Sequence, residues 1–199
     1  MPSLGQHESF DMLRQVVVNM VDTQIKAICL CRDHNLITPA LILCYTTMDQ
    51  MAYLGMPPGQ FDVNEKFFRQ WCDAYMLTGE VVIPCSSADL WGARCGLVHA
   101  HSAESRRYRE GKVNRIFYAW GDKTVDEARS LLSQLDLPEL IIHIDDLISC
   151  TTEAISRFLA EAQRNDDKMW LVFTRAKKVI TNYHDFPGTN TFPHDNASA

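Results

Sequence analysis

The sequence has no apolar run long enough to span a bilayer, which takes about 20 consecutive apolar residues. Residues 1–15 contain no apolar core of the kind found in signal peptides, so we expect no signal peptide and no membrane-spanning segment. The glycine-rich P-loop, the Rossmann fingerprint and the Gly-x-Ser-x-Gly nucleophile motif are also missing. The sequence therefore carries none of the usual signs of nucleotide hydrolysis, dinucleotide binding or serine-esterase chemistry.

The chain contains seven cysteines but no CxxC pair. Their number is odd, and most lie in apolar surroundings with helical spacing, which predicts free thiols in a reducing, cytoplasmic environment. Cys29 and Cys31 would lie on nearly opposite sides of a helix, so they are poorly placed to share a metal ion. We expect neither a metal nor a cofactor in this protein.

Hydrophobic residues make up 46% of the 199 residues, enough to bury a full core. We expect residues 1–184 to form one helical domain, with a β insertion at about 113–144, followed by a mobile tail at 185–199. The formal net charge of -6 argues against nucleic acid covering the whole surface. It leaves open a local basic site.

Apolar residues recur at helical spacing over most of the chain, and several helix starts carry capping residues. Candidate caps are Thr38 before Pro39, Ser86 with Asp89, Thr124 with Glu127, and the pair Asp145 and Asp146. Helices are expected at about residues 9–33, 39–54, 61–77, 87–101, 124–137, 145–163 and 169–183. The second of these, at 39–54, is apolar nearly all round and is expected to be central.

Two segments depart from helical spacing and are rich in β-forming residues, at 113–120 and 140–144. The predicted fold is therefore mainly α, a helical bundle with a small two-stranded β element in the second half. The aromatic residues near 61–77 could stack on bases, but their helical spacing favours packing in the core.

The segment from Arg94 to Arg115 is unlike the rest of the chain, because it holds six basic and two acidic residues, a formal +4. It begins on a helix that carries Arg94 and His99, with His101 directly after it. Such an island beside a titratable histidine favours a phosphate-rich ligand. The candidate phosphate-binding residues are His101, Arg106, Arg107, Arg109 and Lys112.

Arg94 and His99 have the chemistry that metal-independent RNA cleavage requires. A histidine that is neutral near pH 7 can take the 2′-hydroxyl proton or protonate the leaving 5′-oxygen. An arginine binds phosphate through two parallel hydrogen bonds and stabilises charge on the phosphorane. Five residues of helix separate the two side chains by roughly 140°, so a two-fold dimer would be one way to bring such pairs into one cleft.

The sequence from Arg94 to His99, Arg-Cys-Gly-Leu-Val-His, resembles the signature of the HEPN superfamily, in which an arginine precedes a histidine by four to six residues. That resemblance implies an all-α, usually dimeric protein, often a metal-independent endoribonuclease, with Arg94 and His99 as its catalytic pair and RNA as its substrate. The sequence departs from the family at Cys95, where a polar residue is common, and in the strands at 113–144.

Several alternatives stay open. Asp49 is either a buried carboxylate that supports the site or a residue on an exposed face beside Gln50. Arg94 could form a surface or interface salt bridge, His99 could be a hydrogen-bonded residue at a helix end, and the basic island could be a solvated loop. His99 and His101 lack a further ligand at suitable spacing for zinc. The competing function is a non-catalytic helical module that binds a protein or a small ligand.

Overall fold

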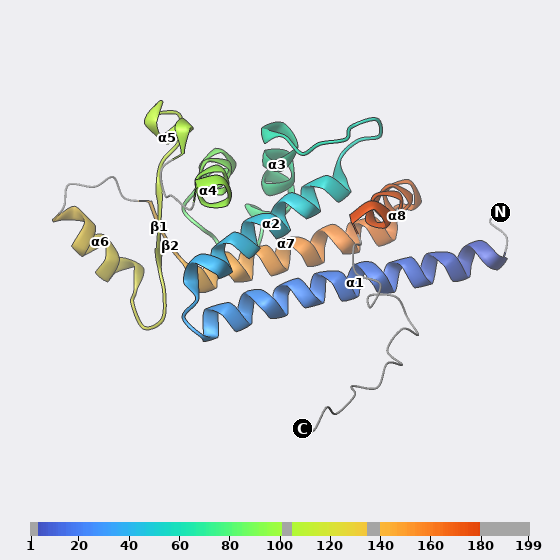
Figure 1. The fold of residues 1–199 in the computed structure, drawn as a ribbon, viewed down its shortest axis with the longest axis horizontal. Helices are drawn as coiled ribbons and strands as arrows, with labels where there is room; N and C mark the ends of the chain where they lie inside the picture. The colour runs from blue at the N-terminus through green and yellow to red at the C-terminus, as the bar shows by residue number, and fades with distance from the viewer. Residues whose placement is uncertain (1–3, 101–104, 135–139, 180–199) are drawn as a thin grey trace, which may run out of the picture.

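The computed structural model describes residues 4–100, 105–134 and 140–179, and for residues 4–13, 99 and 100 it describes the backbone alone (Figure 1). The tail expected at 185–199 and His101 lie outside the described residues. The helices are α1 (Leu4–Asp33), α2 (Ile37–Gly55), α3 (Glu65–Trp71), α4 (Ser87–Ala100), α5 (Arg106–Arg109), α6 (Val125–Ser133), α7 (Ile144–Arg164) and α8 (Asp166–Val179), with a π-helix, η1 (Cys72–Met76). The strands are β1 (Ile116–Ala119) and β2 (Leu140–His143).

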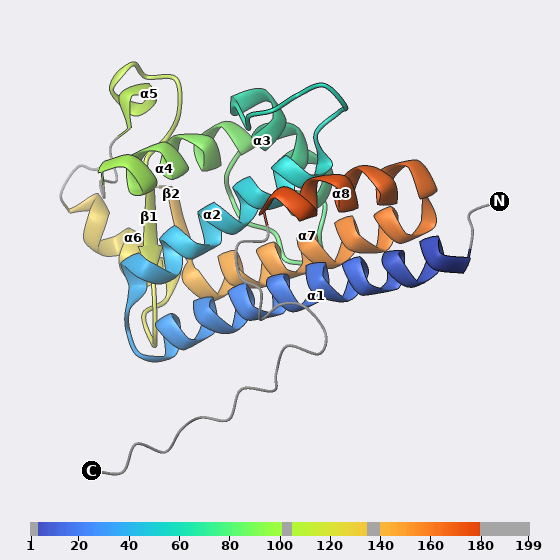
Figure 2. The ribbon, with the colours of Figure 1, turned by 45° about the vertical axis from the view of Figure 1, so that its right-hand side comes forward.

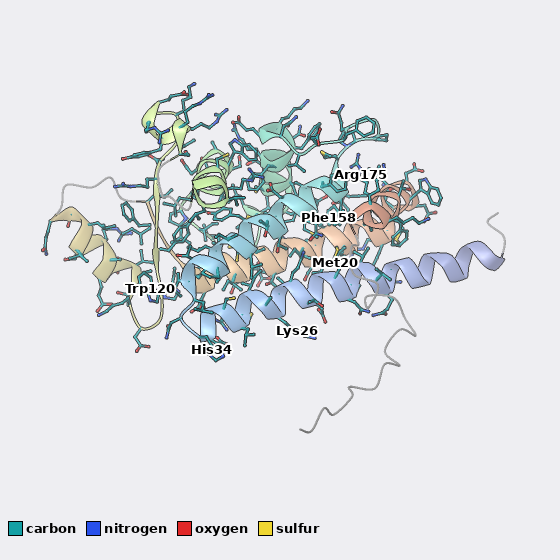
Figure 3. All side chains as sticks on the ribbon, in the orientation of Figure 1. Met20, Lys26, His34, Trp120, Phe158 and Arg175 are labelled. Carbon is teal, nitrogen blue, oxygen red and sulfur yellow. The ribbon has the colours of Figure 1, made fainter. Side chains whose placement is uncertain are left out.

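Helix α2 is the centre of the bundle. It packs against α1, α3, α4, α7 and α8, and Figures 1 and 2 show it between these helices. Nine of its residues are buried, as expected for a helix that is apolar nearly all round. In Figure 3, Met20 and Phe158 lie between helices, whereas Lys26 and His34 point outward. The prediction of a central second helix is confirmed.

The start of α2 differs from the prediction. The helix begins at Ile37, and Leu36 at its N-cap provides no side-chain hydrogen bond, so Thr38 is not the cap. Pro39 falls inside the first turn, where its missing N–H has no intrahelical partner to lose. Asn35 has a φ of 58°, a left-handed conformation that asparagine tolerates well, and it allows the sharp turn out of α1.

The single helix expected at 61–77 is shorter and is divided in two. It begins at Glu65, because the side chain of Asn64 accepts a hydrogen bond from the Phe67 N–H at 3.2 Å, and it changes into η1 after Trp71. Phe61 is 75% exposed and lies outside the helix. Phe67, Phe68 and Trp71 are buried in the core, which favours packing over base stacking for these rings.

The two predicted strands form a small parallel sheet in which Ile116 pairs with Leu140 and Ala119 with His143. Both strands are shorter than predicted, and α6 lies on the connection between them, as parallel pairing requires. The start of α7 also differs from the prediction, because His143 Nδ1, rather than either aspartate, accepts a hydrogen bond from the Asp145 N–H. The fold class, mainly α with a small β element, is confirmed.

A buried tyrosine pair joins the sheet to the bundle. The hydroxyl groups of Tyr45 on α2 and Tyr118 on β1 lie 2.5 Å apart and share a hydrogen bond. Burial, together with the neighbouring Tyr118, raises the pKa of Tyr45, so both hydroxyls stay neutral. Pairing the two hydroxyls avoids the cost of a buried polar group without a partner.

No helix among the described residues is long and apolar enough to cross a membrane. All seven cysteines are free thiols, as predicted, and Cys44, Cys72 and Cys150 are buried. Burial raises the pKa of Cys44 to about 12, which makes this thiol unreactive near neutral pH.

Candidate functional site

Helix α4, which carries Arg94 and His99, begins with the predicted cap. The Ser86 hydroxyl accepts a hydrogen bond from the Asp89 N–H at 3.2 Å, and Asp89 Oδ2 accepts one from the Ser86 N–H at 2.9 Å. The two residues thus satisfy backbone donors at the helix start in both directions. The site is therefore built on a helix whose start is set by its local sequence.

Asp89 also fastens the end of the basic segment to the start of α4. Its Oδ1 accepts hydrogen bonds from the Asn114 N–H at 2.7 Å and from Asn114 Nδ2 at 3.2 Å. Burial raises the pKa of Asp89, but the hydrogen bonds from Ser86 and Asn114 outweigh it and leave the pKa below its usual value. Gly92 allows Val113 to lie close against α4, because a Cβ atom at position 92 would lie only 2.7 Å from Val113 Cγ2. The segment around 105–114 therefore packs back on α4.

Arg94 forms an ion pair with Asp49 of α2. Arg94 Nη2 and Nε lie 2.6 Å and 2.7 Å from Asp49 Oδ2, and each side chain is 17% exposed. Burial lowers the pKa of the Arg94 guanidinium, but the hydrogen bond and the charge of Asp49 outweigh it, so the net pKa is raised. The guanidinium also lies 5.1 Å from the centre of the Trp91 ring, at cation–π distance.

This ion pair bears on two of the open alternatives. Asp49 is a largely buried carboxylate beside Arg94, and the interpretation of an exposed face residue does not fit its 17% exposure. Arg94 is held by a neighbouring helix of the same chain, so its salt bridge lies between α2 and α4. The pair fixes the position of the guanidinium on α4.

Of the two histidines predicted at the site, the structure describes only the backbone of His99. The backbone of His99 belongs to the last turn of α4, while its side chain lies outside what the structure describes. Arg94 and His99 therefore lie on one continuous helix, and on an ideal helix their side chains diverge by roughly 140°. His101 falls in the segment 101–104, which is not described.

The basic residues after α4 are largely paired with carboxylates. Arg106 Nε and Lys112 Nζ lie 3.2 Å and 2.7 Å from the carboxylate of Glu110, and Arg107 pairs with Glu65 of α3. Arg109 is exposed and has no ion pair with any residue that the structure describes. Glu110 is already counted in the formal +4 of the segment, so among these pairs it is the one with Glu65, from outside the segment, that makes the island less basic than its own sequence indicates.

Arg107 approaches the helix that carries Arg94. Burial raises the pKa of the Cys95 thiol, while the positive charges of Arg94 and Arg107 both act to lower it. Arg94 and Arg107, which are 13 positions apart, therefore both lie near Cys95, a half-buried residue of α4. The structure thus brings together Arg94, Asp49 and Arg107 from the residues predicted as site members.

Two further residues contribute to this arrangement. Glu65 orients Arg107 from 42 positions earlier in the chain, and no local pattern links the two. Asn114 joins the basic segment to Asp89, which the sequence marks only as a capping residue. Within residues 4–100, 105–134 and 140–179, no group of three or more His, Cys, Asp and Glu side chains is placed to hold a metal ion.

Comparisons of the chain with family models, with curated proteins and with solved structures found no match. The HEPN resemblance therefore rests on the motif from Arg94 to His99 and on the mainly helical fold.

Proposed function

We propose that this protein is a HEPN-like, metal-independent endoribonuclease or RNA-binding protein that acts through Arg94 and His99. The observation that supports this most is the position of Arg94, which Asp49 holds on α4 beside the charge of Arg107. A guanidinium fixed in this way needs little further ordering before it binds a phosphate oxygen. Arg109, exposed on α5, would add a further phosphate contact.

In the proposed reaction, His99 takes the proton of the 2′-hydroxyl, which attacks the neighbouring phosphorus. The 5′-oxygen leaves and takes a proton from water, to which the His99 imidazolium returns its own, and the products are a 2′,3′-cyclic phosphate and a free 5′-hydroxyl. Arg94 stabilises the negative charge that builds up on the phosphorane oxygens. Arg106, Arg107, Arg109, Lys112 and His101 would contact the RNA backbone on either side.

The proposal includes a cytoplasmic homodimer. The side chains of Arg94 and His99 diverge by roughly 140° on an ideal helix, so in a single copy they would point in different directions. A two-fold axis near α4 would place His99 of one copy opposite Arg94 of the other and complete two equivalent sites.

The test is RNA cleavage in EDTA by the wild-type protein, by His99→Ala and by His34→Ala. His34 is an exposed histidine at the end of α1 and serves as the matched control. We expect His99→Ala to be slower by on the order of 10²- to 10⁴-fold, with His34→Ala unchanged. Equal rates for the wild type and His99→Ala would assign the activity to another residue or to a contaminant.

One observation favours a second function, a non-catalytic helical module that binds a protein or a small ligand. Arg94 is only 17% exposed and paired with Asp49, and an ion pair with the purely structural role of joining α2 to α4 would have the same geometry. Under this function the wild type neither cleaves RNA nor binds it in a salt-dependent way.

A further inference from the structure

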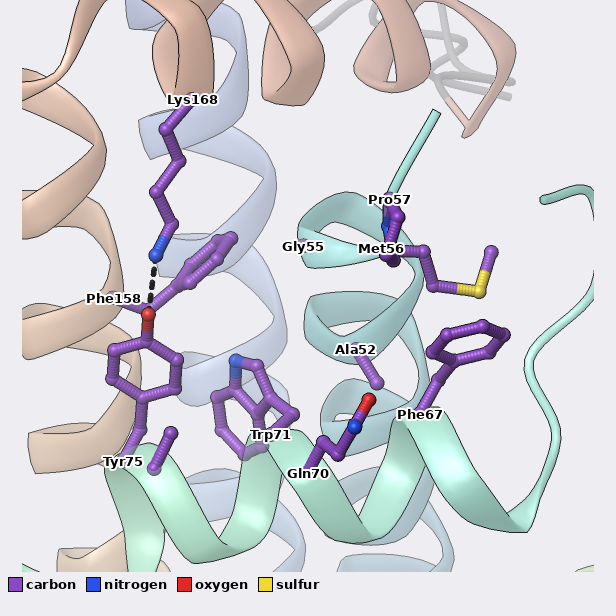
Figure 4. Close-up of a pocket in the computed structure, with 11 residues that line it drawn as sticks. Ala52, Gly55, Met56, Pro57, Phe67, Gln70, Trp71, Tyr75, Phe158 and Lys168 are labelled. Carbon is purple, nitrogen blue, oxygen red and sulfur yellow. Dashed lines mark hydrogen bonds between the residues drawn. The ribbon is translucent and has the colours of Figure 1, made fainter. Parts of the chain in front are cut away.

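A cavity of about 190 Å³ lies apart from α4, among α2, α3, η1, α7 and α8. Figure 4 shows that aromatic rings form much of its wall: Trp71, Tyr75 and Phe158 lie close together on one side, and Phe67 lies on the other. Lys168 of α8 reaches in from above. None of the residues of the α4 site lines this cavity, so it is a separate feature of the fold.

The wall contains a buried donor without a partner. Trp71 is 4% exposed, and its indole Nε1–H has no hydrogen-bond acceptor among the described residues. Figure 4 shows the nitrogen-bearing edge of the indole turned toward the space between Phe158 and Gly55. Buried tryptophan N–H groups usually have a hydrogen-bond partner, because a buried donor without an acceptor costs free energy. An acceptor brought by a ligand would supply that partner.

The space beside this donor is kept open by a glycine. A Cβ atom at Gly55 would lie 3.1 Å from Phe158 Cε2 and 3.9 Å from Trp71 Cδ1, so any larger residue would narrow the cavity. The next wall is η1, which begins directly after Trp71 and carries Tyr75. π-Helical turns are rare and are found often at functional sites. Here the turn sets the position of Tyr75 relative to Trp71.

Lys168 provides a second donor at the cavity. Its ammonium binds the Tyr75 hydroxyl and Glu161 Oε1, the latter at 2.7 Å, and lies 5.3 Å from the centre of the Phe158 ring. An ammonium has three N–H groups, so one remains for a further acceptor. The Lys168 side chain is 20% exposed, which leaves it close to the cavity mouth.

The rim of the cavity is fixed by Arg175 of α8, which is 5% exposed. Its guanidinium donates to the carbonyl oxygens of Met56 and of Pro57, the latter at 2.6 Å, and both of these residues line the cavity. This segment follows α2 and would otherwise be a free loop. The arginine therefore holds one wall in place before any ligand arrives, which lowers the ordering cost of binding.

We propose that this cavity binds a small single-ring molecule that carries a hydrogen-bond acceptor, a carbonyl or a carboxylate oxygen. A cavity of about 150 Å³ is large enough for benzene, so the volume here fits one ring with one substituent. The aromatic wall contacts the ring, and the acceptor binds Trp71 Nε1–H with Lys168 beside it. A carboxylate would gain more from Lys168 than a neutral carbonyl would.

The test is a titration of the full-length protein with benzamide and with benzoate, followed by NMR of the tryptophan indole N–H groups. Trp71→Phe assigns the Trp71 resonance, because that signal alone disappears. We expect this resonance to move downfield with either probe, while that of Trp170, which is 59% exposed on α8, stays in place. Tighter binding of benzoate identifies the ligand class as anionic, and tighter binding of benzamide identifies it as neutral.

Two variants test the assigned contacts, and their binding is followed by the NMR resonance of the Gly55 backbone N–H. Trp71→Phe keeps a ring but removes the donor. We expect its Kd to be roughly three- to tenfold higher, which corresponds to the loss of one hydrogen bond. Ala74→Leu places a larger side chain at an exposed position of the lining and should abolish binding, whereas Ala128→Leu on α6 should not. Binding that is unchanged in Ala74→Leu, or a Trp71 resonance that does not move in the wild type, would overturn the proposal.

Discussion

The ion pair between Arg94 and Asp49 allows a quantitative prediction about stability. In Asp49→Asn the guanidinium stays on α4 but loses the carboxylate 2.6 Å away, and with 17% of the side chain exposed, water can replace only part of that interaction. Removing one partner of a buried ion pair costs about 3–5 kcal/mol. Because the pair here is only partly buried, we expect a loss of about 2–4 kcal/mol in the free energy of unfolding.

A double-mutant cycle separates the ion pair from its surroundings. Arg94→Met leaves the Asp49 carboxylate without its cation, and the double variant has no charge left at this position. We expect each single variant to be destabilised and the double variant to be no worse than either, with a coupling of about 2 kcal/mol or more. Urea unfolding followed by circular dichroism measures all four proteins.

The matched control is the ion pair of Arg129 and Asp126 on α6, whose side chains are 51% and 87% exposed. Exposed pairs contribute about 0–1 kcal/mol, so its cycle should show little coupling. If the effects of Asp49→Asn and Arg94→Met simply add, Asp49 does not hold Arg94, and the reasoning about a fixed guanidinium is refuted.

Two further predictions concern the basic segment and the cap of α4. Replacing Arg106 and Arg109 by Ala should make the log–log salt dependence of single-stranded RNA binding shallower by about 0.7 for each lost phosphate contact, with Arg129→Ala as the unchanged control. Asp89→Asn should cost about 1–3 kcal/mol at pH 7. Because the pKa of folded Asp89 is lowered, this stabilisation is present above about pH 4 and is lost as the pH falls through the folded value, so the difference in urea unfolding between wild type and variant should shrink steadily below about pH 4.

Features that depend on local sequence were predictable. The capping box of Thr124 and Glu127 is present, as is the reciprocal cap of Ser86 and Asp89, because each involves residues only three positions apart. The strands at β1 and β2 were found from their β-forming residues, although their parallel pairing carries no local signal. Asp49 could be singled out as the only charged residue of a largely apolar helix.

Features set by distant contacts could not be predicted. The partner of Arg107 is Glu65 on another helix, so the sequence overstated the net charge of the basic segment. The change from α3 to η1 interrupts a segment whose apolar residues keep helical spacing throughout, and the cavity behind it depends on four helices that meet only in the folded chain. Pro39 suggested a start for α2 two residues later than the observed one, because proline is tolerated throughout the first turn.

The central claim, that Arg94 binds the reacting phosphate, is tested most directly by Arg94→Lys. Lysine keeps the positive charge opposite Asp49, so folding stability should stay close to that of the wild type, but it lacks the planar fork that binds two phosphate oxygens. The measurement is the single-turnover rate of RNA cleavage in EDTA, with urea unfolding as the check on folding. The account predicts a rate lower by on the order of 10²-fold or more in the folded variant. A rate equal to that of the wild type would contradict it.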